Sequence, residues 1–457
     1  MALFDRAALN PGVAPREVLA WSMYDFANSG FTTVVLTAVF NAYFVGAVAA
    51  NASWATLAWT GALALSSLLV ILTMPAIGAW ADIHAAKKRL LLASTIGCVA
   101  ATALLALVQP GDVALAIVLV VAANWFFNTG EALIAAFLPE LARPEKLGTV
   151  SGWGWSFGYF GGMLTLGLSL AWVLSAQQRG ATAAEFVPVT MLITASVFAA
   201  ASVPTFLLLR ERAQKQSAVA TQKQAAVATQ GQPAATTQGH SATPPRSQAL
   251  QRLAQTWRAS DRLVDFRRLL ACGALYQAGI AVVVTLAAVY AEQVMNFTQA
   301  QTMALIFAVN LASVAGAFGF GYAQDRLGHR RALALTLLGW LAMVLIAGLG
   351  RSLQAFWLAA VIAGLCMGSS QSCGRAMVGA LVPSGRQGEF YGLWALAQRV
   401  AGIVGPLSYG FVTWATQGNH RLAILATGGF FVAGLAVLAG IDMARGAKAA
   451  QAVSDAG

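Results

Sequence analysis

The chain has 457 residues, of which 58% are hydrophobic and only 10% are charged. Soluble domains carry about 25% charged residues, so this composition excludes an ordinary soluble protein and indicates an integral membrane protein. The net charge of +11 would fit a nucleic-acid-binding protein, but the basic residues are spread over loops between apolar segments. We therefore expect no nucleic-acid partner.

Twelve apolar segments follow one another along the chain, separated by short polar loops. A helix of about 20 residues crosses the roughly 30 Å hydrocarbon core of a bilayer, and each segment is long enough to do so. The sequence therefore predicts an all-α membrane protein that contacts the lipid bilayer. The spans are expected near 19–49, 55–81, 89–109, 113–138, 150–174, 187–209, 268–291, 299–322, 332–350, 355–382, 389–414 and 421–442.

Acidic and basic residues outside the spans indicate how the chain enters the membrane. The N-terminal segment carries Asp5 and Glu17 and lacks the basic start of a cleaved signal peptide, so we expect the first span to be the insertion signal. Basic residues follow the even-numbered spans, which predicts that these loops and both termini are cytoplasmic. These residues are Lys87, Lys88, Arg89, Arg143, Lys146, Arg326, Arg330, Arg331 and Arg386, against Arg179, Arg351 and Arg421 in the other loops.

A polar segment interrupts the series of spans after the sixth. It is rich in Gln, Ala, Thr and Pro up to about Ser247 and repeats an octad at 214–221 and 222–229. Because such a segment cannot bury much apolar surface, we expect a disordered cytoplasmic linker. Its end fits either a helix lying on the inner leaflet or a basic flank to the seventh span. The expected units are residues 1–209, the linker 210–267, and residues 268–457.

The two halves of the chain repeat each other in three places, in the same order. The loop after span 2 matches the loop after span 8, the end of span 4 matches the end of span 10, and span 5 matches span 11. We infer two homologous six-helix bundles. The matched positions are Gly78, Asp82, Lys87 and Lys88 with Gly321, Asp325, Arg330 and Arg331; Gly130–Pro139 with Gly374–Pro383; and Gly148, Gly152 and Gly162 with Gly388, Gly392 and Gly402.

Twelve spans arranged as six plus six, with a Gly-x3-Asp-x4-basic loop after spans 2 and 8, resemble the major facilitator superfamily. The second copy of the loop motif, which runs from Asp325 to Gly328, is complete. The first copy departs from the pattern, because Ile83 replaces a basic residue and Ala85 replaces a glycine. The resemblance implies a monomer that works by alternating access, with an asymmetric latch on the cytoplasmic side.

The first span carries a narrower resemblance. The stretch WSMYDFANSGFTTVV, Trp21–Val35, is similar to the opening helix of the fungal vacuolar amino-acid effluxers of autophagy and their bacterial relatives. This similarity implies a small-molecule substrate, an amino acid that the protein moves out of its compartment. The alanine-rich composition and the short loops favour a bacterial member in the cell membrane.

Four ionisable residues lie within predicted spans, and such residues are functional candidates because a charge in hydrocarbon is costly. They are Asp25, Glu131, Arg375 and Arg399. Glu131 and Arg375 precede their helix-ending prolines by equal lengths of chain, roughly 12 Å at helical rise, and Asp25 lies at a comparable depth. We therefore expect Glu131 and Arg375 to face each other or a shared ligand; a purely structural ion pair is the alternative.

Polar stripes on the cavity helices of the resembled fold, helices 1, 4, 7 and 10, extend this candidate site. Residues one helical turn apart share a face, and the stripes include the ionisable residues. The candidate substrate-binding or coupling residues are Asp25, Asn28, Asn128, Glu131, Tyr276, Gln277, Gln371, Arg375 and Arg399.

The loops after spans 2 and 8, which share the Gly-x3-Asp-x4-basic spacing, are assigned to gating. Asp82 and Asp325 each end a helix beside basic residues, and each is expected to bind the N-terminus of a neighbouring helix in only one conformation. The gating set comprises Gly78, Asp82, Lys87, Lys88, Gly321, Asp325, Arg326, Arg330 and Arg331.

The leading hypothesis is a secondary transporter for a small solute, with an amino acid implied by the narrower resemblance. The alternative is a proton-coupled exporter of amphiphilic compounds or drugs, in which Glu131 or Asp25 carries the proton. A membrane-embedded enzyme or a sensor is disfavoured, because the four histidines are placed in loops or the linker and the four cysteines inside helices. We expect no cofactor and no metal.

Overall fold

A computed structural model describes residues 4–50, 52, 54–212, 263–293, 299–417 and 419–456. Within these ranges the chain is helical, and an isolated bridge between Leu9 and Ala142 is the one β-type pairing. The expected linker and the possible interfacial helix fall almost entirely on residues outside the described ranges.

The first half of the chain forms six long membrane-spanning elements. The first is composite: α1 continues through a π-helical stretch, the short α2 and a second π-helical stretch. The bounds are α1 Pro15–Gly30, α2 Phe40–Tyr43, α3 Ala55–His84, α4 Lys87–Leu104, α5 Val113–Ala135, the short α6 Leu138–Leu141, α7 Leu147–Gln178 and α8 Ala183–Leu208.

The second half adds six further long helices and a terminal one. The bounds are α11 Val264–Gln293, α12 Gln299–Leu327, α13 His329–Leu349, α14 Leu353–Leu381, α15 Gln387–Ala415, α16 His420–Ala439 and α17 Met443–Ala456. Among the described residues, eleven elements are long and apolar enough to cross a membrane. The twelfth long helix, α15, runs beside α3 and α11, but Gln398 and Arg399 near its centre lower its hydropathy.

The seventh span begins earlier than expected. Residues 264–267, predicted to end the linker, form the first turn of α11. This turn is polar in sequence, yet Asp265 is buried because Arg445 of α17 donates two hydrogen bonds to its carboxylate, at 2.8 and 2.7 Å. The pairing joins segments that lie far apart in the sequence and so has no local signal.

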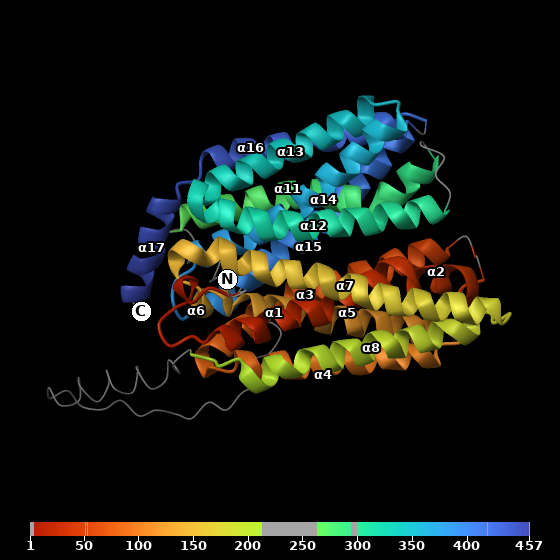
Figure 1. Cartoon of the computed structure of the whole chain (residues 1–457), viewed down its shortest axis with the longest axis horizontal. Coiled ribbons are helices and arrows are strands. Elements are labelled where there is room, and N and C mark those ends of the chain that lie inside the picture. Colours follow the sequence, from red (N-terminus) through yellow and green to blue (C-terminus); the bar gives the residue numbers. More distant parts are fainter. Residues whose placement is uncertain are drawn as a thin grey trace, which may run out of the picture.

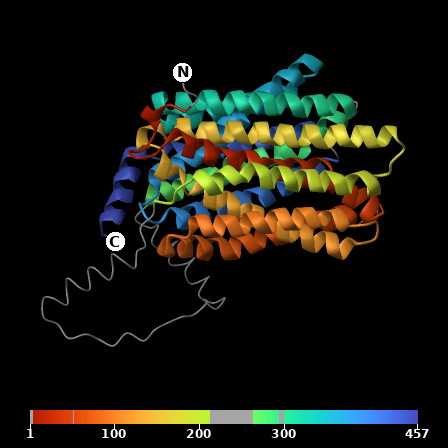
Figure 2. The same ribbon diagram turned by 60° about the horizontal axis from the view of Figure 1, so that its bottom comes forward.

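The helices are arranged in two groups, α1–α8 and α11–α16, that lie against each other (Figure 1). Each group has its own buried apolar cluster. The groups meet mainly where α7 lies beside α12 and where α3 lies beside α15. Both termini lie at one end of the molecule, which we call the termini face (Figures 1 and 2).

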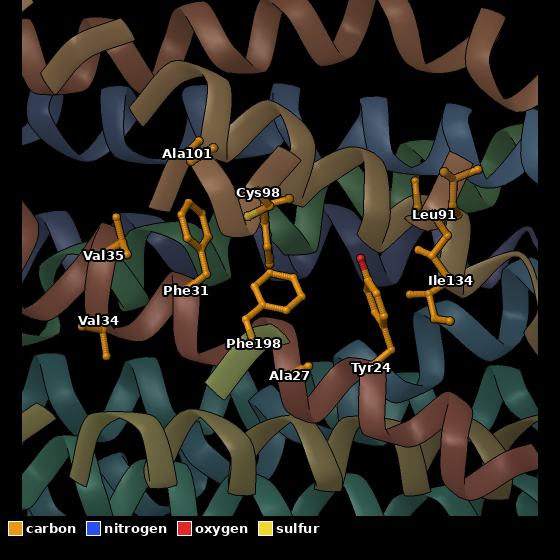
Figure 3. Close-up of a cluster of buried hydrophobic side chains, with 14 of the residues drawn as sticks. Tyr24, Ala27, Phe31, Val34, Val35, Leu91, Cys98, Ala101, Ile134 and Phe198 are labelled. Atoms are coloured by element: carbon orange, nitrogen blue, oxygen red, sulfur yellow. The ribbon is translucent and has the colours of Figure 1, made fainter. Parts of the chain in front are cut away.

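The half of the first span that lies away from the termini face departs from α-helical geometry. Its segments Phe31–Ala38 and Phe44–Val48 are π-helical. Threonine hydroxyls bond to backbone carbonyls here: Thr32 to Ser29 at 3.0 Å and Thr37 to Thr32 at 2.9 Å. Such bonds compete with the helical ladder and bend it. Phe31, at the transition, is buried with Tyr24 and Phe198 in the apolar cluster of the first group (Figure 3).

The second group depends on a buried aromatic stack between α13 and α16. The rings of Trp340 and Phe431 lie 5.4 Å apart and almost parallel, and both residues are fully buried.

We expect Trp340→Ala to leave a cavity and to destabilise the protein by about 3 kcal/mol, measured as thermal unfolding in detergent. Leu338→Ala on the same helix is the control, because Leu338 is 52% exposed on the helix surface; equal unfolding temperatures for the two variants would contradict the prediction.

Candidate functional site

An ion pair inside the membrane-spanning region joins the two groups of helices. Asp25 on α1 and Arg375 on α14 are both buried, and Nη1 of the arginine lies 2.7 Å from Oδ2 of the aspartate. The guanidinium also donates to the Ser151 hydroxyl at 3.1 Å and to the Ser151 carbonyl at 2.9 Å. All three bonds go to the first group, so Arg375 ties the second group to it.

The Arg375 guanidinium is hydrogen-bonded to Asp25 and Ser151, whereas Glu131 interacts with it electrostatically, without a hydrogen bond among the described residues. The expectation that Glu131 and Arg375 face each other or a shared ligand stays a prediction. The sequence placed both carboxylates at a similar depth. What decides between them is the direction in which α1 and α5 face α14, and helix spacing alone does not fix that direction.

Aromatic rings enclose the Arg375 guanidinium on its faces. Its Cζ lies 4.6 Å from the ring centroid of Trp21 and 5.3 Å from that of Trp155. Cation–π attraction strengthens when the cation is removed from water. The Trp21 indole is itself held, because its Nε1 donates to the carbonyl of Ile134 at 2.9 Å. The cation is thus held at a fixed position and orientation.

Space for the ion pair exists because residue 154 has no side chain. A Cβ on Gly154 would lie 2.5 Å from Nη2 of Arg375 and 2.5 Å from Oδ2 of Asp25. Such contacts are far inside van der Waals distance, so any larger residue would displace the pair.

A second pair of opposite charges lies near the first but is not bonded. Glu131 on α5 and Arg399 on α15 belong to different groups and interact electrostatically. Within the described residues, the Glu131 carboxylate has no hydrogen bond or ion pair, and the buried Nε of Arg399 has no hydrogen-bond partner. Both residues are half-buried, and charged groups in such positions are normally paired, so this pair has bonding capacity to offer a ligand.

The other predicted site residues differ in how many of their polar side-chain atoms have hydrogen-bond partners. Asn128 donates to the carbonyl of Asn124 at 2.6 Å, but its own Oδ1 is buried without a partner among the described residues. Gln371 and Gln277 approach each other at 3.4 Å across α14 and α11. Asn28 is buried on α1.

Tyr276 places its hydroxyl against Gly374, the residue before Arg375. It is fully buried in the apolar cluster of the second group, and its hydroxyl has no hydrogen-bond partner in the described part of the chain. In the same part of the chain, no three His, Cys, Asp or Glu side chains come together as metal ligands.

Two contacts to Arg375 were missed by sequence reasoning, although the internal repeat held a signal for them. Ser151 and Tyr391 occupy equivalent positions, each directly before a matched glycine. Ser151 binds the Arg375 guanidinium, and the Tyr391 hydroxyl donates to the Arg375 carbonyl at 2.9 Å. The missed Gly154 has no such signal, because its role depends on the neighbouring helices.

Near the termini face, Asp82 and Asp325 make equivalent contacts between the groups. The Asp82 carboxylate accepts from the backbone N–H groups of Gly388 and Glu389 at 3.1 and 3.0 Å, at the start of α15. The Asp325 carboxylate accepts from the N–H groups of Gly148 and Thr149, both at 3.0 Å, at the start of α7. Each carboxylate therefore binds the positive end of a helix in the opposite group.

The glycines of the loop motif allow this close approach. A Cβ on Gly78 would lie 2.4 Å from the carbonyl oxygen of Gly388, and one on Gly321 would lie 2.8 Å from that of Gly148. The backbones of α3 and α15, and of α12 and α7, can therefore come close enough for the carboxylates to reach the helix ends.

The basic residues of the two motif copies are placed differently. Lys87 is fully buried, paired with Glu140, and Lys88 donates to the carbonyl of Leu209 at 2.6 Å. Both contacts stay within the first group. In the second copy the corresponding residues, Arg330 and Arg331, are exposed, and so is Arg326, which stands where the first copy has Ile83.

Comparison with known proteins decides the family. A family model described as "Vacuole effluxer Atg22 like" matches residues 41–451. The chain belongs to this family. The expected membership of the vacuole-effluxer branch is thereby confirmed, by a match that begins after the stretch Trp21–Val35.

Curated relatives of the Atg22-like chain differ in how much of it they cover. The Bacillus subtilis protein described as an uncharacterized MFS-type transporter, YxiO, is 23% identical over 438 residues, or 92% of this chain and 93% of its own. Autophagy-related protein 22-1 of Penicillium rubens is 28% identical over 220 residues, which are 45% of this chain and 37% of the fungal protein.

Solved structures share the fold along nearly the whole length. The human organic anion transporter MFSD10 has a TM-score of 0.67 at 17% identity and covers 93% of this chain and 99% of its own. The proton:xylose symporter XylE has a TM-score of 0.66 at 14% identity, with 92% and 94% covered. The expected all-α major facilitator fold is confirmed, and the relatives make this chain a membrane transporter, not an enzyme.

We expect Gly154→Ala to disrupt the Asp25–Arg375 pair, because the added methyl group would overlap both partners. Overpacking of this kind costs about 1–3 kcal/mol, measured as a lower unfolding temperature in detergent. Gly167→Ala, on the same helix, is the matched control, since a Cβ at that position meets no atom within 4 Å. Identical unfolding of the two variants would show that the site has room to spare.

Proposed function

We propose that this multi-pass membrane transporter moves a zwitterionic amino acid out of its compartment by alternating access. The unbonded pair of Glu131 and Arg399, which come from opposite groups of helices, is the observation that carries the proposal. The family description as a vacuole effluxer supports the direction of transport.

The charges of the site favour a ligand with one positive and one negative group. Asp25 and Arg375 neutralise each other, so they leave no net charge for the ligand to match. Glu131 can then receive an ammonium group and Arg399 a carboxylate, and charge-assisted hydrogen bonds of this kind are strong when shielded from water. Because the two residues lie on different groups, a bound amino acid would connect the groups.

Alternating access requires that the contacts at the termini face break and reform. Asp82, Asp325 and the Asp25–Arg375 pair all join one group to the other. Their presence fits a state closed at the termini face, and a similar structure, a bacterial homologue of ferroportin with a TM-score of 0.66, was solved outward-facing. We assign the gating role to the two aspartates on this basis.

One observation favours a second candidate, a proton-coupled exporter of amphiphilic compounds or drugs. A carboxyl group that lies inside the membrane without a hydrogen-bond donor, as Glu131 does among the described residues, is suited to carry a proton. Flux into proteoliposomes of radiolabelled amino acids and of an amphiphilic cation, each with and without a proton gradient, distinguishes the candidates.

The proposal also includes the setting of the molecule. We place it as a monomer in a bacterial cell membrane with the termini face toward the cytoplasm, since the loops at that face carry most of the basic residues.

We expect Arg399→Gln to weaken binding of a neutral amino acid, raising the KM for flux by more than about tenfold, because a charged partner of the ligand carboxylate is lost. The matched control is Arg351→Gln, which removes an exposed arginine from the loop before α14, outside the candidate site and the gating set. Unchanged amino-acid flux in Arg399→Gln, with normal insertion, would remove this residue from the site.

Asp325→Asn should lower turnover by about fivefold or more while changing the KM less, because the carboxylate biases a conformational equilibrium and does not touch the ligand. Asp442→Asn serves as control, since Asp442 only caps the start of α17 through the N–H groups of Ala444 and Arg445. A rise in KM at constant turnover would argue against a gating role.

A further inference from the structure

The segment before α1, residues 4–14, is attached to the termini face, and we call it the N-terminal strap. Asn10 donates its backbone N–H to the carbonyl of Leu141 at 3.0 Å, and Arg143 donates its own to the carbonyl of Ala8 at 3.0 Å. The Arg143 side chain adds a bond to the carbonyl of Leu9 at 2.9 Å. These contacts fix the strap to the first group of helices.

A short 3-10 turn follows Phe4, the first residue of the strap. Asp5 starts this turn, Arg6–Ala8, by accepting a hydrogen bond from the N–H of Ala7 at 2.9 Å. Asp5 and Arg6 are exposed, whereas Phe4 is only 7% exposed. The strap therefore keeps its charges outside and buries one aromatic ring.

That ring covers Trp153 on α7. The rings of Phe4 and Trp153 meet edge to face, with centroids 5.1 Å apart and an interplanar angle of 82°, and Trp153 is 1% exposed. Phe157, one turn further along α7, lies 5.9 Å from Phe4. Edge-to-face pairs favour one mutual orientation of the two rings.

The Trp153 indole in turn crosses to the second group of helices. Its Nε1 donates to the hydroxyl of Tyr322 on α12 at 3.1 Å. This bond bridges the same α7–α12 seam that Asp325 bridges at the start of α7.

We propose that Phe4 is a positioning residue for the transport cycle: it holds the Trp153 indole in the orientation that reaches Tyr322 and thereby stabilises the closed α7–α12 seam. The inference rests on the proposed alternating access. Without Phe4, the indole loses its packing on the strap side and can rotate away from the hydroxyl. The strap thus sets how often the termini face opens, although it contacts no residue of the candidate substrate site.

The test measures opening of the seam in the full-length protein in detergent. Ser156 lies on the seam side of α7, and its hydroxyl approaches the carbonyl of Val314 on α12 at 3.4 Å. Ser156→Cys, in a chain whose four native cysteines are replaced by alanine, reports opening through its rate of reaction with a thiol reagent. We expect Phe4→Ala to raise this rate about fivefold, the size expected for a lost aromatic pair.

A double-mutant comparison isolates the route of the effect. Tyr322→Phe removes the hydroxyl and keeps the ring, and it should raise labelling to a similar extent. If Phe4 acts through the indole–hydroxyl bond, Phe4→Ala combined with Tyr322→Phe labels no faster than either single variant. Additive effects, or no change in Phe4→Ala, would overturn the proposal. Phe160→Ala is the control: Phe160 lies on the same helix and is 50% exposed, so its loss should leave the labelling rate unchanged.

The same assay separates this inference from the proposed function. Asp325→Asn should also increase labelling, because it breaks another contact across the seam. A response to Asp325→Asn without a response to Phe4→Ala rejects the strap alone. Failure of both to respond rejects seam opening itself, whereas a negative amino-acid flux experiment leaves the labelling result intact, because the assay contains no substrate.

Discussion

An arginine inside a membrane must be neutralised where it lies, because its guanidinium does not lose its proton and hydrocarbon supplies no hydrogen bonds. Arg375 meets this constraint through Asp25 and Ser151, both on the opposite group of helices. The missing side chain at Gly154 and the flanking Trp21 and Trp155 rings follow from it. The two groups are therefore held together by an electrostatic requirement as well as by packing.

The internal repeat produces pairs of contacts that do equivalent things with different chemistry. Asp82 and Asp325 bind helix ends in the opposite groups with nearly the same geometry. Ser151 and Tyr391, also equivalent, hold the side chain and the backbone of Arg375. The repeats therefore preserve the contacts between the groups near the termini face, while the centre of the molecule diverges. In that centre, one carboxylate and one guanidinium have no hydrogen bond within the described part of the chain.

The spans, the superfamily and the contacts of Asp82 and Asp325 with helix ends could be predicted because each depends on a pattern that is local in sequence or repeated in it. Apolar length predicts spans, and the two matched loops identify equivalent helix ends. The partner of Arg375 could not be predicted, because Asp25 and Glu131 lie at similar depth and differ only in facing. The early start of α11 was missed for a related reason: the main partner of Asp265 is Arg445, which lies far away in the sequence.

The first span combines two mechanical properties in one element. Its inner part, α1, is a regular α-helix clamped at Asp25, whereas the part beyond Gly30 is largely π-helical, with wider turns. A wide turn can tighten or loosen by shifting its hydrogen bonds at little cost compared with breaking a buried ion pair. The part of this span beyond Gly30 can therefore change its helical geometry without displacing Asp25 from its ion pair.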